Sequence, residues 1–207
     1  MAPFKELKFE CIHCGNCCCD PNTLVNVTYL DILQLKNGLK FTIEELLEVL
    51  GFYVYEKKLL QDELLKMVIP PIQTENGPAF VALRKLESGT CVFYNQEKQR
   101  CSIYSARPAF CKTFPFFYFY SSTRENNTEI SNLKIDYTEK ALTYCQGIKN
   151  SAPQIDYDFW LRIGKTTLNA LVKNEKFTIQ WNNESKTSKV KPTAKNYLHA
   201  VFEIEIE

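Results

Sequence analysis

The chain has 207 residues, of which 25 are Lys or Arg and 24 are Asp or Glu, giving a net charge of +1. A nearly neutral chain lacks the basic excess that binding to nucleic-acid phosphates requires, so we expect no nucleic-acid partner. The run nearest to a membrane span, residues 114–120, is far shorter than the roughly 20 residues needed, so we expect no membrane partner. With 45% hydrophobic and 13% aromatic residues, the composition is typical of a folded domain with an ample core.

The first feature along the chain is a cysteine loop, residues 11–19, which holds five of the nine cysteines. Cys11, Cys14 and Cys17 are each separated by two residues. With this spacing, three thiolates can wrap one cubane cluster from a single loop, as in bacterial-type ferredoxins. Gly15 permits the positive-φ turn that such wrapping needs. The loop is therefore predicted to bind an iron-sulfur cluster or a metal ion.

Cys18 directly follows Cys17, so we expect its side chain to point away from that of Cys17 and to supply a second site or remain unligated. The gap and the proline that continue the ferredoxin motif are missing, so we do not expect a simple ferredoxin. His13 lies between two cysteines that are better ligands for such a centre, and it is the weaker candidate.

Disulfide bonds are the main alternative for clustered cysteines. The opening residues 1–10 contain no apolar signal-peptide core and no cleavage site. The number of cysteines is odd, and three consecutive cysteines cannot readily form three relaxed bridges. We therefore expect reduced thiols and a cytoplasmic location.

Two capping boxes, at Thr28 and Thr42, each predict the start of a helix, because an acidic residue follows three positions later. The first helix is expected to stop at Asn37-Gly38 and the second at Gly51. A third helical stretch is expected over residues 52–68, before two prolines. The apolar faces of the first two helices are expected to be formed by Leu30, Leu33, Leu35, Ile43, Leu46, Leu47 and Leu50.

Short β-branched and aromatic segments follow at residues 79–83, 91–94 and 100–104, divided by turn formers. They predict a small antiparallel meander. Helical periodicity returns at about 138–146 and 154–173.

The C-terminal part begins with a polar, lysine-bearing segment, residues 182–196, which we interpret as a surface loop or linker. Strict alternation in residues 177–181 and 202–207 predicts two paired strands, although residues 197–202 also fit one face of a helix. The predicted domains are residues 1–181, a cysteine-cluster metal-binding domain, and residues 182–207, a polar loop and amphipathic segment.

The later cysteines occur in a specific phrase, Cys101-Ser-Ile-Tyr104-x2-Arg107-Pro108-x2-Cys111, preceded by Cys91-Val-Phe93 and followed by a late Cys145. Together with the first loop, this series resembles the YkgJ-type cysteine-cluster family (CxxCxxCC), whose members are described as zinc- or iron-chelating. The resemblance implies a metal-binding set of eight residues: Cys11, Cys14, Cys17, Cys18, Cys91, Cys101, Cys111 and Cys145.

Cys19 has no place in that pattern and is expected to be a free thiol. The family includes a cluster domain similar to that of flagellin lysine N-methylases, which raises the possibility of a methyltransferase. However, the chain contains neither of the glycine-rich motifs that would mark a nucleotide or adenosyl site.

Several residues near the cysteines have two interpretations. Pro108 suits the first turn of a short helix whose N-terminal end would favour a thiolate at Cys111. Arg107 is expected either to bind the cofactor, by hydrogen bonding to sulfur, or to pair with a carboxylate. The aromatic residues either screen a cluster from water or form plain core; they are Phe93, Tyr104, Phe110, Phe114 and Phe116.

Zinc also accepts four thiolates, and eight cysteines could build two closed zinc sites. Structural zinc sites usually show paired C-x2-C knuckles, whereas the later cysteines of this chain are single and widely spaced. We therefore expect a 4Fe-4S iron-sulfur cluster, one or two, with zinc as the alternative cofactor.

Two function classes follow. The chain is either an iron-sulfur protein that passes electrons to a redox partner or assists a modification reaction, or a zinc-binding structural or metal-carrier module without redox activity. The sequence shows no catalytic triad, paired catalytic carboxylates or phosphate loop, so it leaves open whether the protein is an enzyme. The expected partners are a metal ion or cluster and an unknown protein. The predicted fold class is α+β, with helices packed around a small antiparallel meander and a multi-cysteine metal site.

Overall fold

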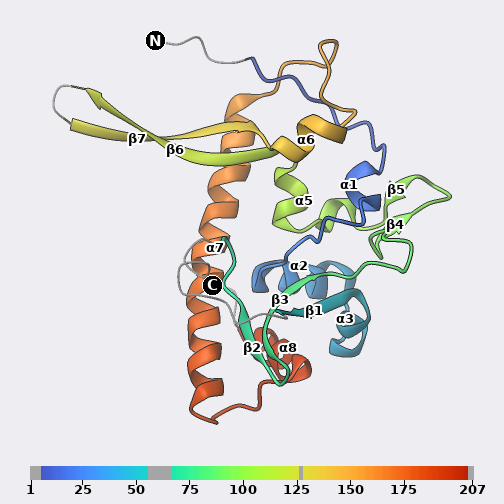
Figure 1. The fold of residues 1–207 in the computed structure, drawn as a ribbon, viewed down its shortest axis with the longest axis vertical. Helices are drawn as coiled ribbons and strands as arrows, with labels where there is room; N and C mark the ends of the chain where they lie inside the picture. The colour runs from blue at the N-terminus through green and yellow to red at the C-terminus, as the bar shows by residue number, and fades with distance from the viewer. Residues whose placement is uncertain (1–5, 56–66, 126–127, 205–207) are drawn as a thin grey trace.

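The computed structural model describes residues 6–55, 67–125 and 128–204 and shows an α+β fold, as the sequence predicts. The long helix α7 runs along one side of the molecule, and α2, α5, β2 and β7 pack against it (Figure 1). The helices are α1 (Asn16–Cys19), α2 (Tyr29–Leu39), α3 (Ile43–Val49), the 3-10 helix η1 (Tyr104–Ala106), α5 (Ala109–Thr113), α6 (Glu139–Tyr144), α7 (Tyr157–Lys186) and α8 (Ala194–Phe202). The strands are β1 (Leu50–Val54), β2 (Ile72–Thr74), β3 (Gly77–Leu83), β4 (Tyr94–Asn95), β5 (Arg100–Cys101), β6 (Phe116–Glu125) and β7 (Thr128–Tyr137).

Both predicted capping boxes are confirmed. Thr28 and Thr42 each accept a hydrogen bond from the backbone N–H of the acidic residue three positions later, and that residue bonds back to the cap. Helix α2 runs on to Leu39 and ends at Lys40, which has left-handed backbone, so the predicted stop at Asn37-Gly38 falls slightly early. Of the predicted apolar face of α2, Leu33 and Leu35 are buried.

The sheet next to these helices has the strand order β1-β3-β2, and both pairings are antiparallel. The helix expected over residues 52–68 is wrong for its opening residues, because Phe52 to Val54 belong to β1; residues 56–66 lie outside the described part. Consecutive aromatic and β-branched residues favour a strand here, and Tyr53 stacks on Phe80 of β3 with 5.4 Å between ring centroids.

Of the strands predicted at residues 79–83, 91–94 and 100–104, the first is confirmed within β3, whereas the second is mostly turn and the third is strand only at Arg100–Cys101. They do not form one meander. Strand β3 pairs with β1 and β2, whereas β4 and β5 form a separate two-stranded unit. An isolated bridge between Lys85 and Cys91 is the link between these two sheets. Such short strands carry too few ladder hydrogen bonds for periodicity to reveal their pairing.

Helix α7 has 30 residues and continues through the strand expected over residues 177–181. That expectation was wrong because Asn174, Thr178 and Trp181 recur at helical spacing and are buried. The polar loop is confined to residues 187–193, because α7 and α8 take up both ends of the expected segment 182–196.

Helix α8 confirms the helical alternative for residues 197–202, and it rules out the strand interpretation at Phe202, while residues 205–207 lie outside the described part. Helices α6 and α7 confirm the predicted helices near residues 138–146 and 154–173. Within the described residues, no helix combines the length and the apolarity that a membrane crossing requires.

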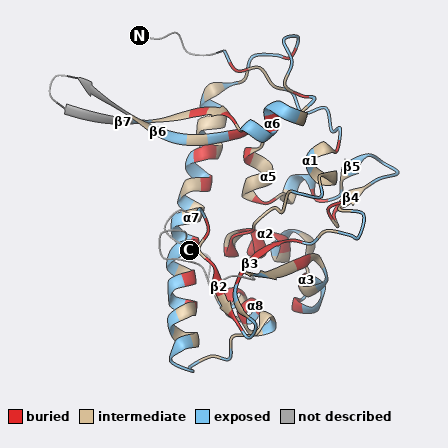
Figure 2. Ribbon diagram, viewed as in Figure 1, coloured by how far each residue is buried: buried red, intermediate tan, exposed pale blue. Residues whose placement is uncertain are grey.

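Two clusters of buried side chains hold the fold together. The large core joins α2, α3, α8, the three-stranded sheet and Trp181 of α7; Figure 2 shows its buried residues concentrated in α2 and the sheet. The small core contains Leu7, Phe116, Ile135 and Tyr137, packed against Trp160. Its hairpin, β6–β7, was not predicted from the sequence.

Candidate metal centre

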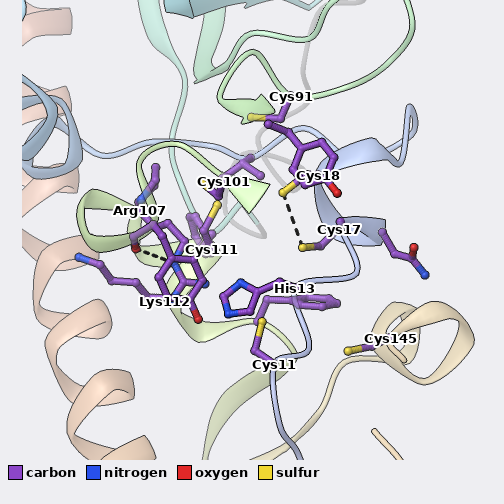
Figure 3. Close-up of a pocket in the computed structure, with 18 of the residues that line it drawn as sticks. Cys11, His13, Cys17, Cys18, Cys91, Cys101, Arg107, Cys111, Lys112 and Cys145 are labelled. Atoms are coloured by element: carbon purple, nitrogen blue, oxygen red, sulfur yellow. Dashed lines mark hydrogen bonds between the residues drawn. The ribbon is translucent and has the colours of Figure 1, made fainter. Parts of the chain in front are cut away.

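A cavity of about 940 Å³ lies between the two cores, and it is lined by cysteines from separate parts of the chain (Figure 3). All nine cysteines of the chain lie in the described residues, and all are free thiols. The cavity lining contains each of the eight cysteines that the family resemblance selects, and Cys19 is not part of it. The eight are Cys11, Cys14, Cys17, Cys18, Cys91, Cys101, Cys111 and Cys145.

Helix α1 brings the first group of thiols to the cavity. Gly15 precedes it with φ 78°, the positive-φ turn that the sequence predicts, and its carbonyl accepts hydrogen bonds from the N–H groups of Cys18 and Cys19. A side chain at Gly15 would collide with the ring of Tyr94. This position therefore needs glycine for both its backbone angle and its space.

Cys17 and Cys18 do not point away from each other, contrary to our expectation. Their Sγ atoms are 3.9 Å apart, because both residues lie in a helical turn rather than in extended chain. Successive helical residues project only about 100° apart, so both thiols can reach the cavity. Cys17 is exposed and Cys18 is half-buried.

Cys91 and Cys101 stand on the side of the cavity that faces the large core. The N–H of Cys91 donates to the carbonyl of Cys18 over 2.8 Å, so the two segments touch through their backbones. Cys101 pairs with Tyr94 across strands β4 and β5. Cys91 is only 7% exposed. A backbone hydrogen bond therefore holds Cys91 beside Cys18, and the β4–β5 register holds Cys101 beside Tyr94.

Cys111 lies in the five-residue helix α5, for which Pro108 is the N-cap rather than a first-turn residue. The buried carboxylate of Asp31 on α2 accepts the N–H of Ala109 over 2.8 Å and holds the start of α5. Burial, and then the charges of neighbouring cysteines, raise the pKa of the Cys111 thiol. The predicted preference for a thiolate at this helix end is therefore outweighed by desolvation in the metal-free protein.

Cys11 and Cys145 lie at the opposite side of the cavity. The N–H of Glu10 donates to the carbonyl of Gly147 over 3.2 Å, which places the strand-like start of the loop beside the turn after Cys145. The side chain of Asn16 donates to the carbonyl of Tyr144 over 2.9 Å and ties α1 to the end of α6. Two segments far apart in the sequence are thus joined next to their cysteines.

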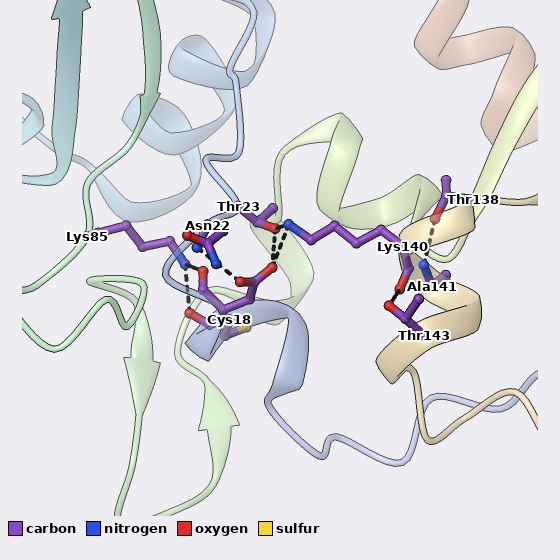
Figure 4. A network of polar contacts seen from close by, with 9 residues as sticks. Cys18, Asn22, Thr23, Lys85, Thr138, Lys140, Ala141 and Thr143 are labelled. Carbon is purple, nitrogen blue, oxygen red and sulfur yellow. Dashed lines mark hydrogen bonds and ion pairs between the residues drawn. The ribbon is translucent and has the colours of Figure 1, made fainter.

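Charged residues hold the end of α1 in place (Figure 4). Lys140 of α6 pairs with Asp20 at 2.6 Å and also donates to Thr23. Lys85 donates to the carbonyls of Cys18 and Asp20 over 3.0 and 3.1 Å. Sequence reasoning missed these residues, because single lysines far from the cysteine motif give no spacing signal.

Arg107 lines the cavity, with its guanidinium 3.6 Å from the centroid of the Tyr104 ring and its Nε donating to the Tyr104 carbonyl. His13 packs on the same ring, with 4.7 Å between centroids, and has φ 56°. Among the residues that the structure describes, no carboxylate forms an ion pair with Arg107. After the hydrogen bond from Cys18, the charge of Arg107 helps to lower the pKa of Cys17, and it offsets part of the rise that burial causes in the pKa of Cys101.

The aromatic residues divide between the two interpretations. Phe93, Tyr104, Phe110 and Phe114 line the cavity, in positions to shield its thiols from water. Phe116 does not, since it belongs to the small core and its ring lies 4.6 Å from that of Trp160.

The thiols differ in acidity. The hydrogen bond with Cys18 lowers the pKa of Cys17 to about 7, helped by the charges of Arg107 and Lys85. The same contact raises the pKa of Cys18, and burial raises the pKa of Cys91. The Cys17 thiol is therefore placed to lose its proton near neutral pH, whereas burial favours the protonated form of Cys91 and Cys111, which an added positive charge such as a metal ion would oppose.

The donor set fits a metal that prefers sulfur. Thiolates select zinc, copper(I) and iron-sulfur clusters over hard cations. Across the described ranges, no three His, Cys, Asp or Glu side chains already stand close enough to hold one ion. The thiols surround the cavity instead, so binding requires their side chains to rotate inwards.

A comparison with protein families matches residues 10–146 to the CxxCxxCC model. The chain belongs to this family. It is described as a "putative zinc- or iron-chelating domain", so metal binding is the function that membership supports, and the resemblance found in the cysteine spacing is confirmed. The uncharacterized protein MJ0661 of Methanocaldococcus jannaschii is 26% identical over 142 residues, which are 69% of this chain and 59% of that protein. The chain thus spans less than two thirds of that relative. No solved structure matches the chain.

Proposed function

We propose that the protein binds an iron-sulfur centre of the 4Fe-4S type in the cysteine cavity and uses it to pass electrons to a protein partner or to assist a modification reaction. The observation that carries the proposal is the convergence of eight thiols on one cavity. Three of them come from the C-x2-C-x2-C loop, whose spacing suits a cubane.

The residues around the thiols suit a charged sulfur-ligated centre. The guanidinium of Arg107 offsets negative charge beside Cys17 and Cys101. Phe110 and Phe114 limit the access of water from their side of the cavity. When bound, a cluster would supply reversible one-electron transfer, and burial and nearby charge would set its reduction potential.

The test is anaerobic purification followed by analysis of metal and acid-labile sulfide. The proposal expects brown protein with iron and sulfide in roughly equal amounts. Colourless protein that carries stoichiometric zinc, after expression with sufficient iron, would contradict it. That outcome would support the second candidate, a zinc-binding structural or metal-carrier module, which has no redox couple.

A further inference from the structure

The eight cysteines of the cavity differ in what lies behind them. Cys91 is part of the large core, and Cys18, Cys101 and Cys111 pack against that core. We call these four residues the inner set. The other four, Cys11, Cys14, Cys17 and Cys145, belong to neither the large nor the small core, and we call them the outer set.

We propose that the inner and outer sets form two separate four-thiolate centres, an inner centre that is part of the fold and an outer centre that is open to solvent. The proposal rests on the proposed metal-binding function and adds to it how the cysteines divide. Four thiolates are the full complement for a tetrahedral zinc ion and for a 4Fe-4S cluster alike.

Backbone contacts connect cysteines within each set. In the inner set, the Cys91 N–H bonds to the Cys18 carbonyl, and the N–H of Ser102 bonds to the carbonyl of Phe93 over 2.8 Å, which draws Cys101 to the Cys91 turn. These contacts involve no side-chain sulfur, so they leave the thiols free to bind metal.

The outer set is connected in the same way. Glu10 bonds to Gly147, which brings the residues next to Cys11 against the turn that follows Cys145. Asn16, two positions after Cys14, bonds to the carbonyl of Tyr144. Figure 3 shows Cys11 and Cys145 on one side of the cavity and Cys91 on the other, with Cys17 between them.

Exposure separates the roles of the two centres. Three of the four outer cysteines are exposed and Cys145 is partly covered, whereas none of the inner four is exposed and Cys91 is buried. The outer centre is therefore the one more open to metal exchange or to a partner, and the inner centre is the one more covered by protein.

The test counts the Co²⁺ bound by full-length protein after anaerobic reconstitution with this metal alone. Cys14→Ala and Cys145→Ala should each lower the bound metal to about half, because each removes one of two centres. The double variant Cys14→Ala/Cys145→Ala should lose no more than either single variant. Adding Cys111→Ala to Cys14→Ala should remove the rest, and the control Cys19→Ala should bind as much as the wild type.

A folded outer-set variant, checked by circular dichroism, that loses all its metal would overturn the division, because it would show one shared centre. So would a greater loss in the outer double variant than in the single variants. If Cys111→Ala does not fold, the comparison among outer-set variants still decides. Wild-type protein that binds neither Co²⁺ here nor iron and sulfide in anaerobic purification would instead refute the proposed metal binding, which keeps the two failures distinct.

Discussion

The two sides of the cysteine cavity are built in different ways. On the inner side, the cysteines extend a core that includes Ile32, Leu35 and Trp181, all nearly inaccessible to solvent. On the outer side, a loop and the end of a short helix meet through single polar contacts such as Asn16 to Tyr144. The cysteines of this cavity are thus supported mainly by apolar packing on the inner side and by hydrogen bonds on the outer side.

This difference has an energetic consequence. Structural zinc sites contribute on the order of 10–16 kcal/mol of apparent binding free energy, comparable with the roughly 5–15 kcal/mol of net stability of a typical domain. Without metal, the inner thiols still pack as small apolar side chains. The outer loop is then held only by its few hydrogen bonds, each of which contributes little net stability. Metal removal should therefore release the outer side first.

The largest effect should come from Cys111→Ala, because it removes a ligand from the side of the cavity that the large core supports. We expect a loss of several kcal/mol of unfolding free energy in the metal-loaded protein. Thermal unfolding of the loaded and metal-free forms would measure it. The matched variant Cys145→Ala should lose much less, and equal losses would contradict the contrast between the two sides.

A pair of aromatic truncations should separate the two cores. Trp181→Ala, in the large core, and Phe116→Ala, in the small core, each remove a buried ring and should cost about 3–5 kcal/mol. Trp181→Ala should weaken the inner centre, and Phe116→Ala the outer one. Metal titration of both variants would show this. If both variants lost metal affinity at the same centre, the two cores would not support the two centres independently.

A smaller effect is expected at Asp31, which joins α2 to the start of α5. Asp31→Ala leaves the partly buried N–H of Ala109 without its acceptor and should cost about 1–3 kcal/mol. It should also weaken the inner centre, since α5 carries Cys111. Asp31→Asn retains an oxygen acceptor and should restore much of the metal affinity in the same titration. No rescue would show that the charge matters more than the hydrogen bond.

The sequence predicts most helices correctly because their signals are local. The capping boxes at Thr28 and Thr42 define two starts, and the buried spacing of α2 follows from its own residues. The hairpin β6–β7 and the separation of β4–β5 from β3 depend on pairing between distant residues, which local periodicity does not encode. The C-terminal part of α7 was missed because the short segment around Phe177 fits both the alternation of a strand and the spacing of a helix.

The candidate site was predictable in composition but not in arrangement. The family resemblance selects the eight thiols that the cavity gathers and leaves out Cys19. It does not reveal that Cys17 and Cys18 both face the cavity, because that depends on the four-residue helix α1. Lys85 and Lys140 were not predictable, since their roles arise from contacts that only the fold creates.

The smallest effect should be at Lys140, whose ion pair with Asp20 secures the outer side. Lys140→Met should speed chelator-driven loss of metal from the outer centre a few-fold, with little change in unfolding free energy. Lys195→Met is a matched control, because Lys195 pairs with Glu44 at 2.9 Å between α8 and α3. If both variants release metal equally fast, the Asp20 contact has no special role.

The pH dependence of this difference follows from Asp20. Its hydrogen bond with Lys140, and then that with Thr23, lower its pKa to about 2. A folded-state pKa below the unfolded value means that the ion pair contributes above the unfolded pKa of about 3.9 and is lost as the pH falls through the folded value. The ratio of release rates between Lys140→Met and wild type should thus stay constant from about pH 8 to about pH 5, although both rates rise as the thiolates gain protons. A ratio that falls towards one within this range would mean that a group other than Asp20 holds Lys140 in place.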